Sequence, residues 1–114
     1  YERFAVTILR LIAPQIRRYP NAFGRALSAL EFHLGSAKEI VILGEKSNEL
    51  EKEVWREYLP NKVVVLAANA ANADLIPLLS DKTAADGKPT AYVCENFVCQ
   101  KPATDKKALS SQLV

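Results

Sequence analysis

The chain has 114 residues, of which 49% are apolar and 25% are charged, and its formal net charge is +2. This length and composition are typical of one globular domain with a core of its own. No apolar run approaches the roughly 18 residues of a membrane-spanning helix, and no signal-peptide pattern opens the chain. The arginines of residues 1–35 are scattered, so the sequence indicates neither a nucleic-acid nor a membrane partner.

Residues 1–35 carry a helical pattern. Apolar residues recur at helix spacing in YERFAVTILRLIAPQIRRYP, where Pro14 predicts a kink or a restart. A second helix is predicted up to Gly35, with Asn21 as its N-cap. The apolar stripe of the first helix is wide enough for burial on two sides, so we expect a longer protein to precede it. The isolated fragment is then expected to expose an apolar patch through which it could oligomerise.

A β-strand, helix, β-strand pattern follows. KEIVILG and KVVVLA are short β-branched runs that are apolar on both faces, as in strands of a covered parallel sheet. SNELEKEVWREYLP lies between them and predicts a helix, in which Asn48 and Glu51 have the spacing of a capping box. The three elements together predict a βαβ unit with a right-handed crossover.

The remaining residues are less regular. ANADLIPLL predicts a short helix or turn, TAYVC a third strand, and TDKKALSSQL a closing helix capped by Thr104. We therefore expect an α/β fold: two N-terminal helices, then a small, mainly parallel sheet of three or four strands with flanking helices. The expected domains are residues 1–35 and residues 36–114.

The two cysteines, Cys94 and Cys99, are the first candidate site. On one straight strand they would lie roughly 16 Å apart, whereas a disulfide needs Cα atoms within about 7 Å. Pairing therefore needs a turn, which Glu95 and Asn96 could supply. A metal site needs about four ligands, and His33 is the only histidine. The favoured interpretation is two buried or half-buried thiols, with a disulfide or redox pair and a metal site as alternatives.

The loops that follow the predicted strands are the second candidate site. Ligands of open parallel sheets bind at the carboxyl ends of the strands, where this chain places polar residues. These are Glu45, Lys46, Asn69, Asn72, Glu95 and Asn96. Solvated turns are the simpler interpretation of the same residues. The single glycine of VILGEKSNELE lacks the spacing of a dinucleotide-binding loop, and the sequence indicates no cofactor, no metal and no catalytic residue.

One resemblance covers nearly the whole chain. PTAYVCENFVCQKPATDKKALSSQL resembles the C-terminal signature of the YyaL-type proteins, a family that includes spermatogenesis-associated thioredoxin-domain proteins. LGSAKEIVILGEKSNELEKEVWREYLPNKVVVLA is similar to the region just upstream in that family. The resemblance implies an N-terminal thioredoxin-like domain, a toroid of helical hairpins like those of sugar epimerases and six-hairpin glycosidases, and this α/β region at the end. It makes residues 1–35 the last hairpin of the toroid, and only Cys94 and Cys99 match a family pattern here.

These patterns predict a non-catalytic C-terminal accessory module of a larger protein, packed against upstream domains of the same polypeptide. The larger protein is left open as an enzyme. One alternative is a thiol-redox module that uses Cys94 and Cys99, and another is small-ligand binding at the strand loops. Two cysteines in 114 residues do not form a disulfide scaffold, so we expect a reducing compartment and a cytoplasmic location.

Overall fold

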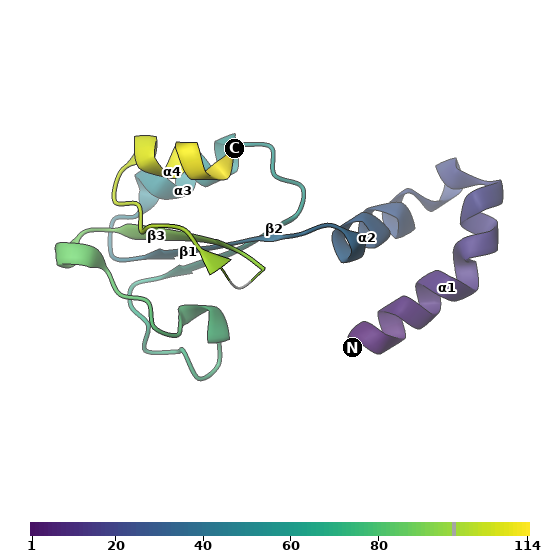
Figure 1. Cartoon of the computed structure of the whole chain (residues 1–114), viewed down its shortest axis with the longest axis horizontal. Helices are drawn as coiled ribbons and strands as arrows, with labels where there is room; N and C mark the ends of the chain where they lie inside the picture. The colour runs from purple at the N-terminus through teal and green to yellow at the C-terminus, as the bar shows by residue number, and fades with distance from the viewer. Residues whose placement is uncertain (97) are drawn as a thin grey trace. The chain divides into compact units, whose positions relative to one another are not determined.

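The computed structural model describes residues 1–96 and 98–114, which form two units, Tyr1–Ser36 and Ala37–Val114. The first unit is a pair of helices joined by one turn of 3₁₀-helix (Figure 1). Its elements are α1 (Glu2–Arg18), η1 (Pro20–Phe23) and α2 (Gly24–Leu34). Ile16 is the one buried side chain among residues 1–36. The packing of the two helices on each other therefore gives this unit almost no core.

Two local expectations for these helices are corrected. Pro14 does not restart the helix, since α1 continues through it to Arg18. The alternative of a kink stays a prediction, because a proline inside a helix removes one hydrogen bond and its ring clashes with the carbonyl four residues before it. Asn21 is not an N-cap, because the chain first makes the turn of η1, where the amide of Ala22 donates to the carbonyl of Tyr19 at 3.0 Å. Helix α2 then begins at Gly24.

The second unit is built on a four-stranded sheet with the order β2-β1-β3-β4. Its strands are β1 (Lys38–Leu43), β2 (Lys62–Ala67), β3 (Thr90–Glu95) and β4 (Val98–Cys99). Strands β1 and β2 are parallel and are joined through α3 (Asn48–Arg56), which confirms the βαβ unit. The other two pairs, β1 with β3 and β3 with β4, are antiparallel.

The α/β class and the two leading helices are confirmed, but the sheet is not mainly parallel. A parallel β3 would need a crossover that returns the chain to the edge where β1 starts. Residues 68–89 instead form turns and the short helices η2 (Pro77–Leu79) and η3 (Ala85–Gly87). They end beside the carboxyl end of β1, where Thr90 pairs with Leu43, so β3 runs the opposite way.

Both faces of the central strands β1 and β3 are covered, which explains why these strands are buried on both sides, whereas Val63 and Leu66 on β2 are 39% and 45% exposed. Helix α3 and helix α4 (Lys106–Leu113) lie on one face, and the segment that contains η2 lies on the other (Figure 1). The helix-side core consists of Ile40, Ile42, Leu50, Val54, Ala91, Val93, Ala103, Leu109 and Leu113. The loop-side core has the buried residues Val41, Leu43 and Leu79. Successive residues of β1 thus enter different cores.

The helix caps differ from those the sequence indicates. Asp105, rather than Thr104, caps α4, and its Oδ1 accepts a hydrogen bond from the amide of Ala108 at 2.9 Å. Asn48 is the first residue of α3, and the N-cap position belongs to Ser47, whose side chain makes no capping hydrogen bond. A one-residue shift moves the cap in both cases, because several adjacent residues there have capping side chains.

Candidate functional site

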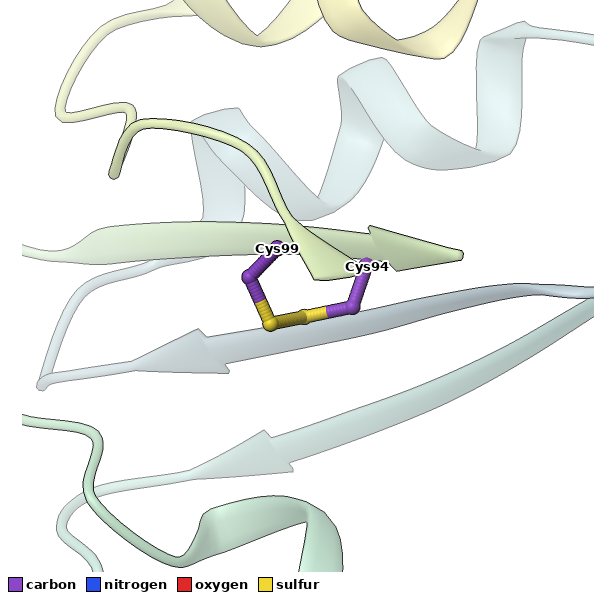
Figure 2. The surroundings of a disulfide bond; sticks show 2 residues. All are labelled: Cys94 and Cys99. Carbon is purple, nitrogen blue, oxygen red and sulfur yellow. A yellow bond between two sulfur atoms is a disulfide. The ribbon is translucent and has the colours of Figure 1, made fainter. Parts of the chain in front are cut away.

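Cys94 and Cys99 form a disulfide across the hairpin of β3 and β4 (Figure 2). Their sulfurs are 2.01 Å apart and their Cα atoms 3.9 Å apart. The two residues are register partners, and the amide of Gln100 donates to the carbonyl of Val93 at 2.9 Å, so the cysteines occupy a pair without mutual hydrogen bonds. In such pairs opposed residues approach most closely. The interpretation as two free thiols is therefore wrong, and the disulfide alternative is correct.

The turn of this hairpin begins at the residues that the sequence suggests. Asn96 has a φ of 49°, in the left-handed region that asparagine tolerates better than most residues. The turn reverses the chain directly after β3, so that Cys99 faces Cys94 instead of lying far along the same strand. The two cysteines would be too far apart on one straight strand, and the hairpin brings them within disulfide distance.

The two cysteines differ in exposure. Cys94 lies in a central part of the sheet and is only 2% exposed, whereas Cys99 is exposed on the short strand β4. Figure 2 shows both side chains leaving the sheet on the side away from the helices. This is the face of the loop-side core, to which Val41 and Leu43 also point. One cysteine of the disulfide is thus an exposed residue and the other is buried.

An apolar groove of about 520 Å³ lies beside the disulfide. It is lined by Glu39, Leu75, Ile76, Pro77, Leu78, Lys82, Cys94 and Cys99. Leu75 is 82% exposed although it neighbours residues that pack on the loop-side core. Glu39 and Lys82 are the two ionisable side chains with opposite charges in this lining, and Glu39 is also the register partner of Cys94 on β1. The disulfide therefore borders a mostly apolar surface.

The wall of the groove is fastened to the sheet by Tyr92. Its hydroxyl donates to the carbonyl of Thr83 at 2.6 Å and accepts from the amide of Thr83 at 3.2 Å. The ammonium of Lys82 lies 5.9 Å from the centroid of the Tyr92 ring. Leu79, in the middle of residues 75–83, is buried in the loop-side core, and Ile76 and Leu78 pack against that core. These contacts hold residues 75–83 in a fixed position against β3.

The loop candidates do not all come together. Four of them follow the carboxyl ends of the parallel strands β1 and β2: Glu45, Lys46, Asn69 and Asn72. At this end of the sheet the amide of Gly44 donates to the carbonyl of Ala67 at 3.0 Å. The other two, Glu95 and Asn96, lie at the opposite end of the strands, because β3 is antiparallel to β1 and Glu95 pairs with Lys38 at the start of β1.

At the first of these ends, the Oδ1 of Asn69 accepts from the amide of Ala71 at 2.9 Å, which makes a local turn. The carbonyl of Asn72 accepts from the amides of Leu75 and Ile76 at 3.0 and 2.9 Å. These atoms stabilise the loop itself. Ligand binding by the four residues stays a prediction.

His33 lies on α2 and faces α1. Its Nδ1 is 3.9 Å from Oε1 of Glu2, and both side chains are well exposed to solvent. Within the described residues no three metal-ligating side chains come together. Nor does any described helix have the length and apolar character needed to cross a bilayer.

The groove itself was missed by the sequence argument. Its main wall comes from Leu75–Leu78, which the sequence presents as an apolar run broken by Pro77 and predicts only as a short helix or turn. The one feature of the sequence that pointed to the groove was Pro77. It prevents a regular helix, so the apolar residues around it do not line up on one helix face. Its position beside the disulfide depends on the antiparallel course of β3.

Comparison with known proteins gives one group of relatives. The chain is 35% identical to spermatogenesis-associated protein 20 of Homo sapiens and 32% and 31% identical to those of Rattus norvegicus and Mus musculus. Each alignment covers 107 residues, which is 88% of this chain and 14% of the relative. No family model and no solved structure matches the chain. The family resemblance is confirmed, and the chain corresponds to a small part of these larger proteins.

Proposed function

We propose that this chain, a homologue of one part of spermatogenesis-associated protein 20, is a thiol–disulfide module of a larger protein. Cys94 and Cys99 are its reacting pair. The observation that carries the proposal is the disulfide between a buried and an exposed cysteine beside an open groove. Thiol–disulfide exchange requires an accessible sulfur, and Cys99 is the exposed residue of the pair.

A purely structural disulfide is the competing interpretation. Closing a loop of about six residues constrains the unfolded chain by only about 2 kcal/mol. Strand β3 is already held by six register pairs with β1 and by the bridge between Ala91 and Ala103. The bond therefore fastens β4 and does little for the rest of the sheet, so that opening and closing it leaves the fold in place.

The exchange is a two-electron transfer from a partner that carries two thiols. A partner thiolate bonds to the sulfur of Cys99, the Cys94–Cys99 bond breaks, and its electron pair leaves on the sulfur of Cys94, which takes up a proton. The second partner thiolate attacks the first partner sulfur and releases Cys99 as a thiolate. The partner ends as a disulfide and this chain as a dithiol, and the reverse steps reduce a disulfide substrate and restore the Cys94–Cys99 bond.

Redox titration of the folded chain tests this proposal. The chain is equilibrated in native buffer with defined ratios of reduced and oxidised dithiothreitol, quenched with acid, alkylated in denaturant so that buried Cys94 also reacts, and analysed by intact mass. We expect both cysteines to become alkylated together over one reversible two-electron transition, with an unchanged circular dichroism spectrum. Reduction that occurs only in denaturant, or only together with unfolding, would show that the disulfide is structural.

This proposal agrees with the predicted cytoplasmic location. Stable structural disulfides are rare in reducing compartments, and those that occur there are mostly transient, catalytic or redox-sensing. A Cys94–Cys99 pair that opens and closes belongs to that second group. The location itself stays a prediction, which imaging of the tagged full-length protein would test.

A second function, docking within the larger protein, is favoured by the first unit. Its apolar side chains are exposed on both helices, with Phe4 and Leu11 on α1 74% and 71% accessible and Phe32 on α2 46% accessible. A groove of about 750 Å³ runs between α1 and α2, and its apolar lining includes Ile8, Ile12 and Phe32. An apolar patch of this kind on a monomer marks an interaction site. We propose that other helices of the larger protein cover it, as in the helical toroid that the resemblance implies.

Binding in trans tests the docking proposal. The remainder of the full-length protein is produced separately and titrated with this chain by sedimentation velocity. We expect a complex that the double change Phe4→Ser and Leu11→Ser weakens at least tenfold, whereas Arg3→Ser on the same helix has little effect. Equal binding by all three proteins would contradict the proposal, as would self-association of the chain in place of a mixed complex.

A further inference from the structure

We infer that the groove beside the disulfide recognises the thiol partner as an extended polypeptide with an apolar residue next to its cysteine. This inference rests on the proposed thiol–disulfide exchange and names the substrate class of that same site. The lining of the groove includes both cysteines of the disulfide, Cys94 and Cys99. A segment bound in the groove therefore brings its own side chains next to the reacting cysteines.

The chemistry of the lining favours an apolar occupant. Four consecutive residues, Leu75–Leu78, form most of the wall, and all four have apolar side chains. Leu75 is 82% exposed and is held beside the groove by the turn of Asn72, whose carbonyl accepts two backbone hydrogen bonds. Covering Leu75 with an apolar side chain would remove both surfaces from water, which favours binding.

The charges of the lining disfavour a small anionic thiol. Glu39 and Lys82 carry opposite charges, so the groove offers little net attraction to an anion such as glutathione. Lys82 is also engaged with the ring of Tyr92. A neutral peptide segment needs no net charge in the groove, and its apolar side chain can pack against residues 75–78.

The sheet edge favours an extended backbone. Strand β4 comes last in the strand order, so among the described strands none pairs with its outer edge. Its two residues, Val98 and Cys99, are both exposed. An extended segment can add to such an edge through main-chain hydrogen bonds. A cysteine in that segment would then approach Cys99, the exposed member of the disulfide.

Reduction kinetics with matched thiols test the inference. The probes are glutathione, a blocked pentapeptide Gly-Leu-Cys-Leu-Gly and its counterpart Gly-Ser-Cys-Ser-Gly, with dithiothreitol as a reductant that needs no groove. Each rate constant is divided by the thiolate fraction of the probe at the working pH, because only the thiolate attacks. The readout is the mixed disulfide on Cys99 and the alkylated thiol of Cys94, both identified by mass.

We expect the leucine peptide to react at least tenfold faster per thiolate than the serine peptide or glutathione. Leu75→Ser should remove this advantage and leave the rate with dithiothreitol unchanged. Leu66→Ser is the matched control, since Leu66 is also partly exposed but lies on β2, at the far edge of the sheet from β4. Circular dichroism melting confirms that both variants are folded.

The possible failures are distinguishable. Equal rates per thiolate for the three probes, with dithiothreitol still active on the folded chain, would overturn the groove as a recognition site and leave the exchange intact. A faster reaction of the leucine peptide that persists in Leu75→Ser would likewise overturn the groove as a recognition site and leave the exchange intact. Failure of every thiol to open the disulfide of the folded chain would overturn both the exchange and this inference.

Discussion

At the scale of single residues, two lysines connect the sheet to the ends of its helices. Lys38 and Lys62 are register partners at the start of β1 and β2. The ammonium of Lys38 donates to the carbonyls of Gln112 and Leu113 at 3.1 and 3.0 Å, at the end of α4. That of Lys62 donates to the carbonyl of Val54 at 3.2 Å, near the end of α3. Each cation satisfies carbonyls that a helix end leaves without partners.

Replacement of Lys38 by methionine should destabilise the second unit by about 1–2 kcal/mol, because two charge-assisted hydrogen bonds to the end of α4 are lost. The free energy of unfolding, measured by urea titration, checks this expectation. Lys52→Met is the control, since Lys52 is exposed on α3. An equal loss in the two variants would mean that the helix-end contacts contribute nothing specific.

Gly44 is a second residue whose role follows from its backbone. It has a φ of +115°, and a Cβ placed there would lie 2.9 Å from the Cα of Pro89. Gly44→Ala should therefore cost about 1–3 kcal/mol of stability through backbone strain and the close contact. Gly24→Ala is the contrast, since Gly24 is helical with open space around it and alanine favours a helix. Thermal melts of both variants test the difference; equal melting temperatures would contradict it.

At the scale of elements, β4 is the least secured strand of the sheet. It contributes two register pairs with β3, and the disulfide links one of those pairs. The strands β1, β2 and β3 each have six residues, and their pairings extend over their full lengths. Once the disulfide is open, β4 is held mainly by its two register pairs with β3. Its mobility therefore depends on the redox state of the cysteines.

Reduction should accordingly release β4 and leave the central strands closed. The amide of Gln100, which donates to Val93, should exchange with solvent at least tenfold faster in the reduced chain. The amide of Ile42 in β1 should keep its protection. Hydrogen exchange followed by NMR of oxidised and reduced protein gives both values. Unchanged protection at Gln100 would show that β4 stays paired without the bond.

At the scale of the whole molecule, the two units differ in how they are stabilised. Residues 37–114 contain the helix-side and loop-side cores, whose members lie on strands, helices and loops distant in sequence. Residues 1–36 contain one buried side chain, Ile16, and helices of 17 and 11 residues. Most of the stability of such helices in proteins comes from the packing of an apolar face rather than from helix propensity. The packing of the first unit on itself therefore contributes little to its stability.

A truncation tests this difference. The chain 37–114 should fold by itself and unfold cooperatively, with a melting temperature within a few degrees of the second unit in the full chain. The peptide 1–36 should show little helix by circular dichroism, because its apolar stripe has nothing to pack against. A disordered 37–114, or a stably helical 1–36, would contradict the assignment of the cores.

The sequence by itself determined the elements with strong local patterns. The apolar periodicity of residues 2–18, the β-branched runs at 38–43 and 62–67, and the helix between them appear where the pattern places them. The βαβ unit followed because two covered strands joined by a helix have essentially one geometry. The family resemblance, which the comparisons confirm, also came from the residues alone.

Only the tertiary structure decided the direction of β3, the pairing of the cysteines and the groove beside them. A strand covered on both faces reads the same whether its neighbour is parallel or antiparallel, so TAYVC could not reveal its course. That course puts Glu95 at the edge where β1 begins, and the hairpin that follows places Cys99 opposite Cys94. Contacts between residues distant in the chain fix the course of β3 and the position of the groove, whereas the disulfide joins two residues only five apart that the hairpin brings together.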